Sequence, residues 1–300
     1  MKILRDIAIV THCVTDLELE IRTWERLLNY RLCERGQLSD ALCTVWGTPA
    51  EQGREYALLQ PASGAPVYMR FIATGDRPGY WPPVTWGWNA TEILVQDPDQ
   101  LTRDLEGTAI RRFGGPADLY TAPKAPRAMQ ALGPSGAMLY FTRLLPGGSR
   151  YGLHGAKSYV DRVFNVVLGG PSLDELRAFY KDTMRLRVGE PMPFTMTLAA
   201  QACDAPADTL FPICVAPLRA RHSILELDEY PQNATPRPRA ADALPGGMSM
   251  VSFNTGLLAD VPVSLRAAPA AVAEFPYNGR RAAVIVGPAQ EWLELIETPT

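Results

Sequence analysis

The sequence predicts an α+β fold made of four similar units, each with one helix and several strands. Two observations support this prediction: parts of the first half recur in the second half at a constant offset, and the recurring segments have the apolar periods of strands and of an amphipathic helix. A third is that 27 prolines and 24 glycines in 300 residues favour many short elements joined by turns. A chain of this length also corresponds to about two ordinary domains.

The first unit begins with a strand and continues with a helix. Residues 8–14 form an apolar run typical of a half-buried strand. In residues 15–32, apolar side chains recur at steps of four, three and four from Leu17 to Leu28, which places them on one face of a helix. Strand-like segments follow at 41–47, 55–60 and 67–73.

The third unit repeats this arrangement in the second half of the chain. Residues 163–170 predict a strand and residues 171–188 predict a helix. The apolar faces of the two helices match at an offset of 156 residues: Leu173 with Leu17, Tyr180 with Trp24 and Met184 with Leu28. Further strand-like segments follow at 194–201, 209–218 and 222–230.

The second and fourth units have weaker signals. Residues 89–105 begin the second unit, residues 248–268 begin the fourth, and a Gly-Pro pair recurs in their closing segments at 133–134 and 287–288. Prolines and glycines gather where units should meet, in residues 77–88, 145–157 and 236–247. We therefore expect two domains, residues 1–150 (units at about 1–79 and 80–150) and residues 151–300 (units at about 155–245 and 246–300).

This arrangement resembles the vicinal oxygen chelate superfamily, which includes glyoxalases, extradiol dioxygenases and bleomycin-resistance proteins. The resemblance rests on strands followed by an amphipathic helix that ends in LLNYRL or DTMRLRV, and on closing strands such as GPAQEWLELIE. It extends over the whole chain and implies four βαβββ modules, paired into two glyoxalase-like domains with cupped mixed sheets. Because the superfamily contains isomerases, lyases, oxygenases and binding proteins, the resemblance specifies the fold better than the reaction.

The resemblance also implies where a metal site would lie, since the family's metal ligands come from the first and last strands of its modules. In the first half these positions are held by Ile9, Arg70, Ala90 and Tyr140, which are poor ligands for a divalent cation. In the second half they are held by Asn165, Glu226, Met250 and Glu294. Carboxylates therefore remain in the second half alone, and the histidines that an extradiol dioxygenase would need are absent.

Glu226 and Glu294 are accordingly the expected catalytic pair. Two carboxylates that face one cavity can hold a hard cation, and together with Asn165 they favour Mg²⁺ or Mn²⁺ over Zn²⁺ or Fe. We expect either no cofactor or such a metal, weakly bound by Glu226 and Glu294. Without a metal, burial and mutual repulsion would raise one pKa and leave the other carboxylate ionised, as proton transfer next to a carbonyl requires. The alternative for Glu294 is a place in a solvated terminal strand.

Four residues are expected to bind substrate: Asn165, His222, Arg70 and Tyr140. Alternation puts His222 on the same strand face as Glu226, although an exposed edge strand would show the same pattern. Arg70 could bind an anionic group through two of its guanidinium nitrogens, or it could pair with an acid at the surface. Tyr140 could line an aromatic pocket.

Composition and charge exclude several classes of protein. A net charge of −3 removes the usual electrostatic basis for binding nucleic acid or an anionic membrane. The sequence contains no apolar run of about 18 residues, the length needed to cross a bilayer, and its first residues lack the pattern of a secretory signal. We therefore expect a cytoplasmic protein. Five cysteines without a CxxC pair suit reduced thiols. The motifs GxGxxG, GxxxxGK[ST], GxSxG and HExxH are absent.

The sequence thus predicts a glyoxalase-like lyase or isomerase that acts on a small, oxygen-rich organic molecule through carboxylate acid/base groups, with or without a metal. The alternative is a metal-free protein that binds a small molecule or drug, as bleomycin-resistance proteins do. An extradiol-type dioxygenase is a third hypothesis. The expected partner is a small molecule, and the chain is expected to be a monomer or a homodimer.

Overall fold

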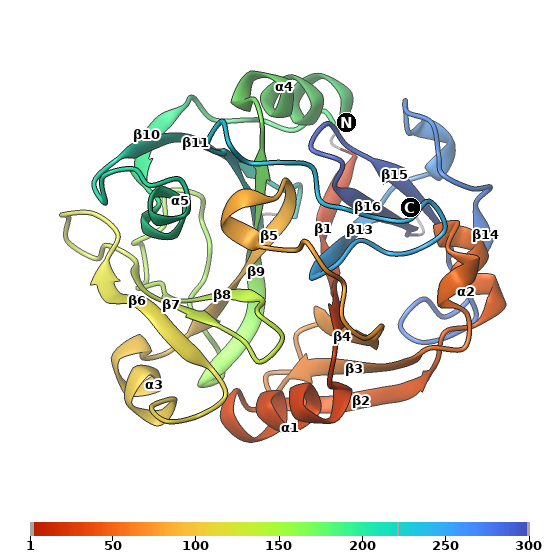
Figure 1. The fold of residues 1–300 in the computed structure, drawn as a ribbon, viewed down its shortest axis with the longest axis horizontal. Helices are drawn as coiled ribbons and strands as arrows, with labels where there is room; N and C mark the ends of the chain where they lie inside the picture. The colour runs from red at the N-terminus through yellow and green to blue at the C-terminus, as the bar shows by residue number, and fades with distance from the viewer. Residues whose placement is uncertain (1–2, 221, 299–300) are drawn as a thin grey trace.

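The computed structural model describes residues 3–220 and 222–298, and these residues confirm the α+β fold class. Two mixed eight-stranded sheets stand side by side, with short helices on their faces and edges (Figure 1). We call them sheet I, with the strand order β14-β15-β16-β13-β1-β4-β3-β2, and sheet II, with the order β10-β11-β12-β9-β5-β8-β7-β6.

The elements are short, as the prolines and glycines predict. Sheet I contains β1 (Leu4–Val14), β2 (Tyr30–Gln37), β3 (Glu55–Pro61), β4 (Tyr68–Ala73), β13 (Met248–Thr255), β14 (Ala270–Ala271), β15 (Arg281–Val286) and β16 (Trp292–Glu297). Sheet II contains β5 (Gly87–Val95), β6 (Arg111–Asp118), β7 (Arg127–Leu132), β8 (Met138–Arg143), β9 (Val160–Gly170), β10 (Met192–Thr195), β11 (Leu210–Pro217) and β12 (Ile224–Glu229). The α-helices are α1 (Leu17–Leu27), α2 (Asp40–Trp46), α3 (Pro98–Asp104), α4 (Leu173–Ala178) and α5 (Thr197–Ala202). Short 3₁₀ turns lie at Pro49–Glu51, Pro82–Val84 and Leu258–Asp260, and a π-helical turn lies at Phe179–Thr183.

The sheets combine the four units differently from the predicted division at residue 150. Sheet I joins the first unit to the fourth through antiparallel pairing of β1 with β13, whereas sheet II joins the second unit to the third through β5 and β9. The first strand of each unit would otherwise be an unpaired edge, open to pairing with another chain. Sequence similarity identified the units correctly, but it contains no signal for which of these edges meet.

The predicted first helix begins where expected and ends earlier. Asp16 caps α1, because its carboxylate accepts a hydrogen bond of 2.9 Å from the backbone N–H of Leu19. The chain leaves the helix at Asn29, whose φ of 53° lies in the left-handed region that asparagine tolerates, and then enters β2. Arg185, 156 residues later, has a φ of 57° and ends the helix of the third unit in the same way.

Two segments that were predicted as strands contain helices. Residues 41–47 belong to α2, whose first turn is capped by the Ser39 hydroxyl and whose end is set by Gly47 with a φ of 65°. Its buried side chains, Leu42, Cys43, Val45 and Trp46, have a helical rather than an alternating spacing. Residues 194–201 are likewise divided between the end of β10 and α5. The strand interpretation overlooked these capping residues and this spacing.

A large apolar core lies between the two sheets. It contains side chains from both sheets together with the buried faces of α1, α3 and α4. Trp24 of α1, for example, packs against Phe71 of β4 and Tyr30 of β2, with ring centroids 5.3 and 4.8 Å away. Each large side chain buried in this way contributes about 1.5–3 kcal/mol, so the shared core stabilises the packing of the two sheets against each other.

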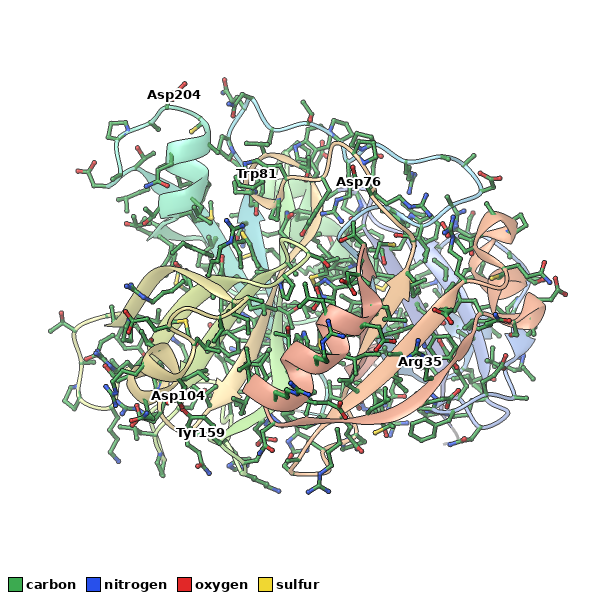
Figure 2. The ribbon with its side chains drawn as sticks, turned by 60° about the horizontal axis from the view of Figure 1, so that its bottom comes forward. Arg35, Asp76, Trp81, Asp104, Tyr159 and Asp204 are labelled. Atoms are coloured by element: carbon green, nitrogen blue, oxygen red, sulfur yellow. The ribbon has the colours of Figure 1, made fainter. Side chains whose placement is uncertain are left out.

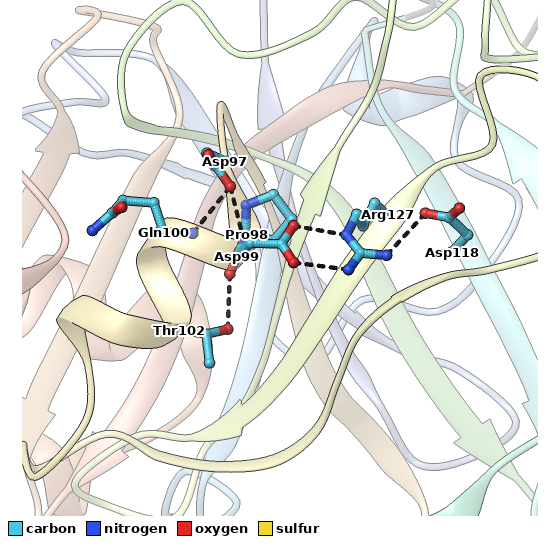
Figure 3. Close-up of polar contacts among 7 residues, drawn as sticks. All are labelled: Asp97, Pro98, Asp99, Gln100, Thr102, Asp118 and Arg127. Carbon is cyan, nitrogen blue, oxygen red and sulfur yellow. Dashed lines mark hydrogen bonds and ion pairs between the residues drawn. The ribbon is translucent and has the colours of Figure 1, made fainter.

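Helix α3 shows how the short helices are fixed to the sheets (Figure 3). Asp97 caps its first turn, accepting hydrogen bonds from the backbone N–H groups of Asp99 at 2.9 Å and Gln100 at 3.0 Å. Arg127 of β7 donates two hydrogen bonds to the Asp99 carboxylate, at 2.7 and 2.8 Å, and a third to Asp118 of β6 at 3.2 Å. This fork fixes the start of the helix over two neighbouring strands.

The end of α3 is attached to the segment that enters the third unit. Asp104 and Tyr159 lie side by side in Figure 2, and the tyrosine hydroxyl donates a hydrogen bond of 2.5 Å to the carboxylate. Trp81, labelled in the same view, is 48% exposed and lies on the segment that passes from sheet I to sheet II. None of the described helices has the length and apolar character needed to cross a membrane.

Candidate active site

Four strands at the centre of sheet II place polar side chains on the face turned away from the shared core. β5 contributes Glu92, β8 contributes Thr142, β9 contributes Asn165 and β12 contributes Glu226. Their sequence neighbours Ile93, Val166 and Leu225 point the other way, into the core between the sheets. The period of two along each strand therefore separates the side chains that face the core from those that face away from it, as predicted for residues 224–227.

The amide of Asn165 bridges the two carboxylates. Its Nδ2 donates hydrogen bonds to Glu92 at 2.7 Å and to Glu226 at 3.2 Å. Thr142 donates a hydrogen bond of 2.5 Å to the other oxygen of Glu92. Among the described residues, the buried Oδ1 of Asn165 has no hydrogen-bond partner, so the site contains an unsatisfied acceptor.

The group lies at the polar end of a mostly apolar cavity. The cavity has a volume of about 320 Å³ and is lined by Glu92, Thr142, Asn165 and Glu226 together with many aromatic and aliphatic side chains. These include Tyr120, Leu144, Tyr151, Phe164, Phe194 and Ile224. Arg150 contributes the one cationic side chain among the lining residues described. An apolar cavity with a few convergent polar groups is typical of a small-molecule site.

The two carboxylates have unusual proton affinities. Burial, followed by the nearby charge of Glu92, raises the pKa of Glu226 to about 8. Burial also raises the pKa of Glu92, while the hydrogen bonds from Thr142 and Asn165 act in the opposite direction and favour its ionised form. These effects make Glu226 the better candidate for the acid and Glu92 the better candidate for the ionised base.

A smaller hollow adjoins Glu226 on the same face of the sheet. Its volume is about 30 Å³, and its lining includes Tyr140, Glu226, Asp228 and Tyr230. Burial, followed by the charge of Glu226, raises the pKa of Asp228 well above its usual value and so favours the neutral form of this carboxyl. Tyr140, predicted from the sequence to line a pocket, thus lies beside Glu226.

The equivalent face of sheet I is filled. Glu294 of β16 is 0% exposed and accepts hydrogen bonds from Trp46 of α2 at 2.7 Å, from Tyr277 at 2.7 and 2.9 Å, and from Ser252. Arg70 of β4 donates to the Tyr277 hydroxyl at 2.7 Å and lies 4.0 Å from the Glu294 carboxylate. The Arg70 guanidinium also lies over the Trp46 ring, 5.0 Å from its centroid. Arg70 thus pairs with an acid, inside the protein rather than at its surface.

The predicted pairing of Glu226 with Glu294 is wrong. The two carboxylates belong to different sheets, because the fourth unit pairs with the first and not with the third. They cannot face one cavity or hold one metal ion together. The alternative interpretation of Glu294, a place in a solvated terminal strand, is wrong as well, because the side chain is completely buried.

His222 also lies elsewhere than predicted. It is exposed, precedes β12, and lines a separate hollow that includes His154 and not Glu226. The alternation used to place it holds only from Ile224 onward, where the strand begins. Of the expected substrate-binding residues, Asn165 and Tyr140 lie at the sheet II site, whereas Arg70 and His222 do not.

Glu92 is the site residue that the sequence analysis missed. The family's position in the second unit was assigned to Ala90, which lies two residues earlier on the same face of β5. Glu92 is the one charged residue in a strand that is otherwise uncharged and completely buried. A buried charge needs a partner or a function, and this signal was present in the sequence.

The donor atoms at this site do not form a divalent-metal site. Carboxylate oxygens suit Mg²⁺ or Mn²⁺, but the N–H groups of Asn165, rather than its oxygen, point at both carboxylates. Among residues 3–220 and 222–298, no three His, Cys, Asp or Glu side chains are grouped as metal ligands would be. The chemistry proposed for this site therefore uses no metal.

Comparison with known proteins agrees with the fold. Glyoxalase I from Zea mays superposes with a TM-score of 0.62 at 12% identity, over 97% of this chain and 92% of that one. A proposed dioxygenase from Bacillus subtilis subsp. subtilis str. 168 superposes with a TM-score of 0.63 at 11% identity, over 100% of this chain and 87% of that one. No family model and no curated protein matches the sequence. The chain thus shares its overall fold with these two proteins, which agrees with the fold that the resemblance implies.

Proposed function

We propose that this protein is an enzyme that moves a proton next to the carbonyl group of a small, largely apolar molecule in the sheet II cavity. The observation that supports this proposal most directly is the carboxylate pair bridged by Asn165 at the polar end of that cavity. Two neighbouring carboxyl groups that share one proton supply both an acid and a base at neutral pH.

Each group has a defined part in the reaction. The Glu92 carboxylate removes a proton from the carbon next to the carbonyl, while the protonated Glu226 donates its proton to the carbonyl oxygen, which gives an enol. With an α-hydroxycarbonyl substrate the enol is an enediol: Glu92 returns its proton to the former carbonyl carbon while Glu226 takes back the proton of the other hydroxyl, which completes an isomerase reaction. With a leaving group on the β-carbon, that group departs with the proton held by Glu92 while Glu226 takes back the enol proton, which completes a lyase reaction. General acid and base groups of this kind contribute roughly 10²–10⁴-fold each to the rate.

The other residues of the site orient these two groups. Asn165 holds the carboxylates at a fixed separation, and Thr142 restrains Glu92 from its other side. The aromatic and aliphatic lining lowers the polarity around the charged groups, which strengthens their interactions with the substrate. The lining also favours a substrate with an apolar body, whereas the sequence analysis expected a small, oxygen-rich molecule.

Deuterium exchange tests the proposal without knowledge of the natural substrate. The protein is incubated in D₂O with a panel of aryl and alkyl ketones, aldehydes and α-hydroxyketones, and deuterium at the α-carbon is measured by NMR. We expect at least one apolar member of the panel to exchange faster with the protein than without it. Glu226→Gln and Glu92→Gln should each lower that rate by roughly 10²-fold or more.

A matched control is available on the surface. Glu190 is a glutamate with an 89% exposed side chain, so Glu190→Gln should leave the exchange rate unchanged. Equal exchange rates for the wild-type protein and Glu226→Gln would contradict the proposed mechanism. Exchange by the wild-type protein that occurs only after Mn²⁺ is added would contradict it as well.

The second candidate function is binding without chemistry, as in a resistance-type protein. The apolar lining of the cavity favours it, because such a surface captures hydrophobic molecules whatever the state of the carboxylates. The same panel distinguishes the two functions. Saturable binding of apolar carbonyl compounds with no exchange of their α-protons would support binding alone.

A further inference from the structure

The hollow lined by His154 and His222 lies at the junction of the two sheets, away from the carboxylate pair. It has a volume of about 470 Å³, and we call it the junction hollow. Its lining comes from the start of β1, the turn between β3 and β4, the glycine-rich segment before β9, β9 itself and the residues just before β12. Both sheets therefore contribute to it.

Four side chains that are cationic or can become so line the junction hollow: His154, Lys157, Arg162 and His222. Arg162 of β9 is the most enclosed of them, and its Nη1 is buried without a hydrogen-bond partner among the described residues. A buried guanidinium nitrogen without an acceptor costs free energy. That cost is recovered when an acceptor binds beside it.

The two carboxylates of the hollow are already engaged. Asp161 is 2% exposed and accepts hydrogen bonds from the Ser63 hydroxyl and, at 2.6 Å, from the backbone N–H of Lys157. Asp6 accepts a hydrogen bond of 2.5 Å from Asn254. Neither acid is hydrogen-bonded to Arg162, although the charge of Asp161 acts on its guanidinium. The Nη1 of Arg162 therefore still lacks an acceptor among the described residues.

We propose that the junction hollow binds a small anion through a phosphate or carboxylate group held by Arg162, with Lys157, His154 and His222 around it. The planar guanidinium donates paired hydrogen bonds to both kinds of group. The volume exceeds that of a single phosphate ion and leaves room for a small organic body. A divalent metal is a poorer fit, since the described residues offer no cluster of three His, Cys, Asp or Glu ligands here.

Calorimetric titration at constant ionic strength tests this site, with inorganic phosphate and citrate as separate probes. We expect at least one of them to bind the wild-type protein, and Arg162→Gln to weaken that binding at least tenfold. Arg162→Lys should recover part of the affinity, because it restores the charge without the fork. Arg35→Gln is the control, since Arg35 is an arginine with a 43% exposed side chain on β2 and does not line the hollow (Figure 2).

Two further sets of variants in the same titration make the result decisive. If Arg162→Gln lowers the melting temperature, the exposed residues His154 and His222 replace it as test positions, and His154→Gln and His222→Gln should each weaken binding about twofold to fivefold. Glu226→Gln should bind the anion as the wild type does, which separates this site from the proposed active site. No binding of either probe, or an equal loss in Arg35→Gln, overturns the proposal.

Discussion

Glu226 and Glu294 are the same kind of residue in equivalent last strands, yet their surroundings give them opposite roles. Glu294 accepts hydrogen bonds from Trp46, Ser252 and Tyr277 and lies beside the Arg70 cation. Glu226 receives one long hydrogen bond from Asn165 and lies near a second carboxylate. Glu294 is thus held in a closed polar cluster, whereas burial beside another acid stabilises the protonated form of Glu226.

The raised pKa of Glu226 predicts how stability changes with pH. Between the ordinary glutamate pKa of 4.5 and the folded value of about 8, the unfolded chain has lost this proton while the folded protein retains it. The free energy of unfolding of the wild type should therefore fall as pH rises through this window, by up to about 1.4 kcal/mol per pH unit from this group.

Glu226→Gln cannot ionise and should lack this contribution. Urea denaturation at pH 5, 6, 7 and 8 measures the effect: the variant should gain stability relative to the wild type as pH rises. A constant difference between the two proteins across these pH values would show that the pKa of Glu226 is not raised.

Glu294→Ala should have the opposite consequence for stability. It leaves the Arg70 cation buried without its acid and removes the acceptor of the Trp46 and Tyr277 donors. Removing one partner of a buried ion pair costs about 3–5 kcal/mol. Urea denaturation at pH 7 should show this loss, whereas the exposed control Glu190→Ala should change stability by less than about 0.5 kcal/mol. A loss below about 1 kcal/mol would mean that this polar cluster is not important for the fold.

At the scale of elements, α2 accounts for much of the difference between the two sheets. Its buried residues Leu42, Val45 and Trp46 pack with Val284 and Trp292 of sheet I in one apolar cluster. The cluster covers the face where Arg70 and Glu294 lie, which leaves no room for a ligand there. In sheet II the equivalent face keeps its cavity. Two sheets built from similar units thus differ in this face, which is closed in sheet I and open in sheet II.

Loss of the α2 cap should destabilise the protein without affecting the cavity of sheet II. Ser39 accepts a hydrogen bond of 3.1 Å from the backbone N–H of Leu42. Ser39→Ala should lower the free energy of unfolding by about 1 kcal/mol, as caps of this type do, and should leave ligand binding at the sheet II cavity unchanged. Thermal unfolding and a binding titration of the same sample check both expectations, and weaker ligand binding would show that the two faces are coupled.

At the scale of the whole molecule, the order of units along the chain determines which fragments can fold. The second and third units are adjacent in sequence and together form sheet II, whereas sheet I is made from the two ends of the chain. A fragment of residues 80–245 therefore contains the complete strand pairing of the candidate site. A fragment of residues 1–150 contains half of each sheet and leaves the β1 and β5 edges unpaired.

We predict that the 80–245 fragment shows a cooperative thermal transition, at a lower temperature than the full chain because it exposes its side of the shared core. The 1–150 fragment should show none. Circular dichroism melting of the two purified fragments checks this directly. A folded 1–150 fragment together with an unfolded 80–245 fragment would contradict the pairing of units described here.

The sequence by itself determined the four units, the α+β class and the polar positions of single strands, such as Asn165 and Glu226. These follow from local periodicity and from self-similarity, which any chain segment carries with it. Only the tertiary structure decided which units pair, and hence that Glu226 meets Glu92 and not Glu294. Pairing of strand edges joins residues 73 positions apart in one sheet, Glu92 with Asn165, and joins the two ends of the chain in the other. Such contacts depend on the shape of the whole core, and no pattern within one unit specifies them.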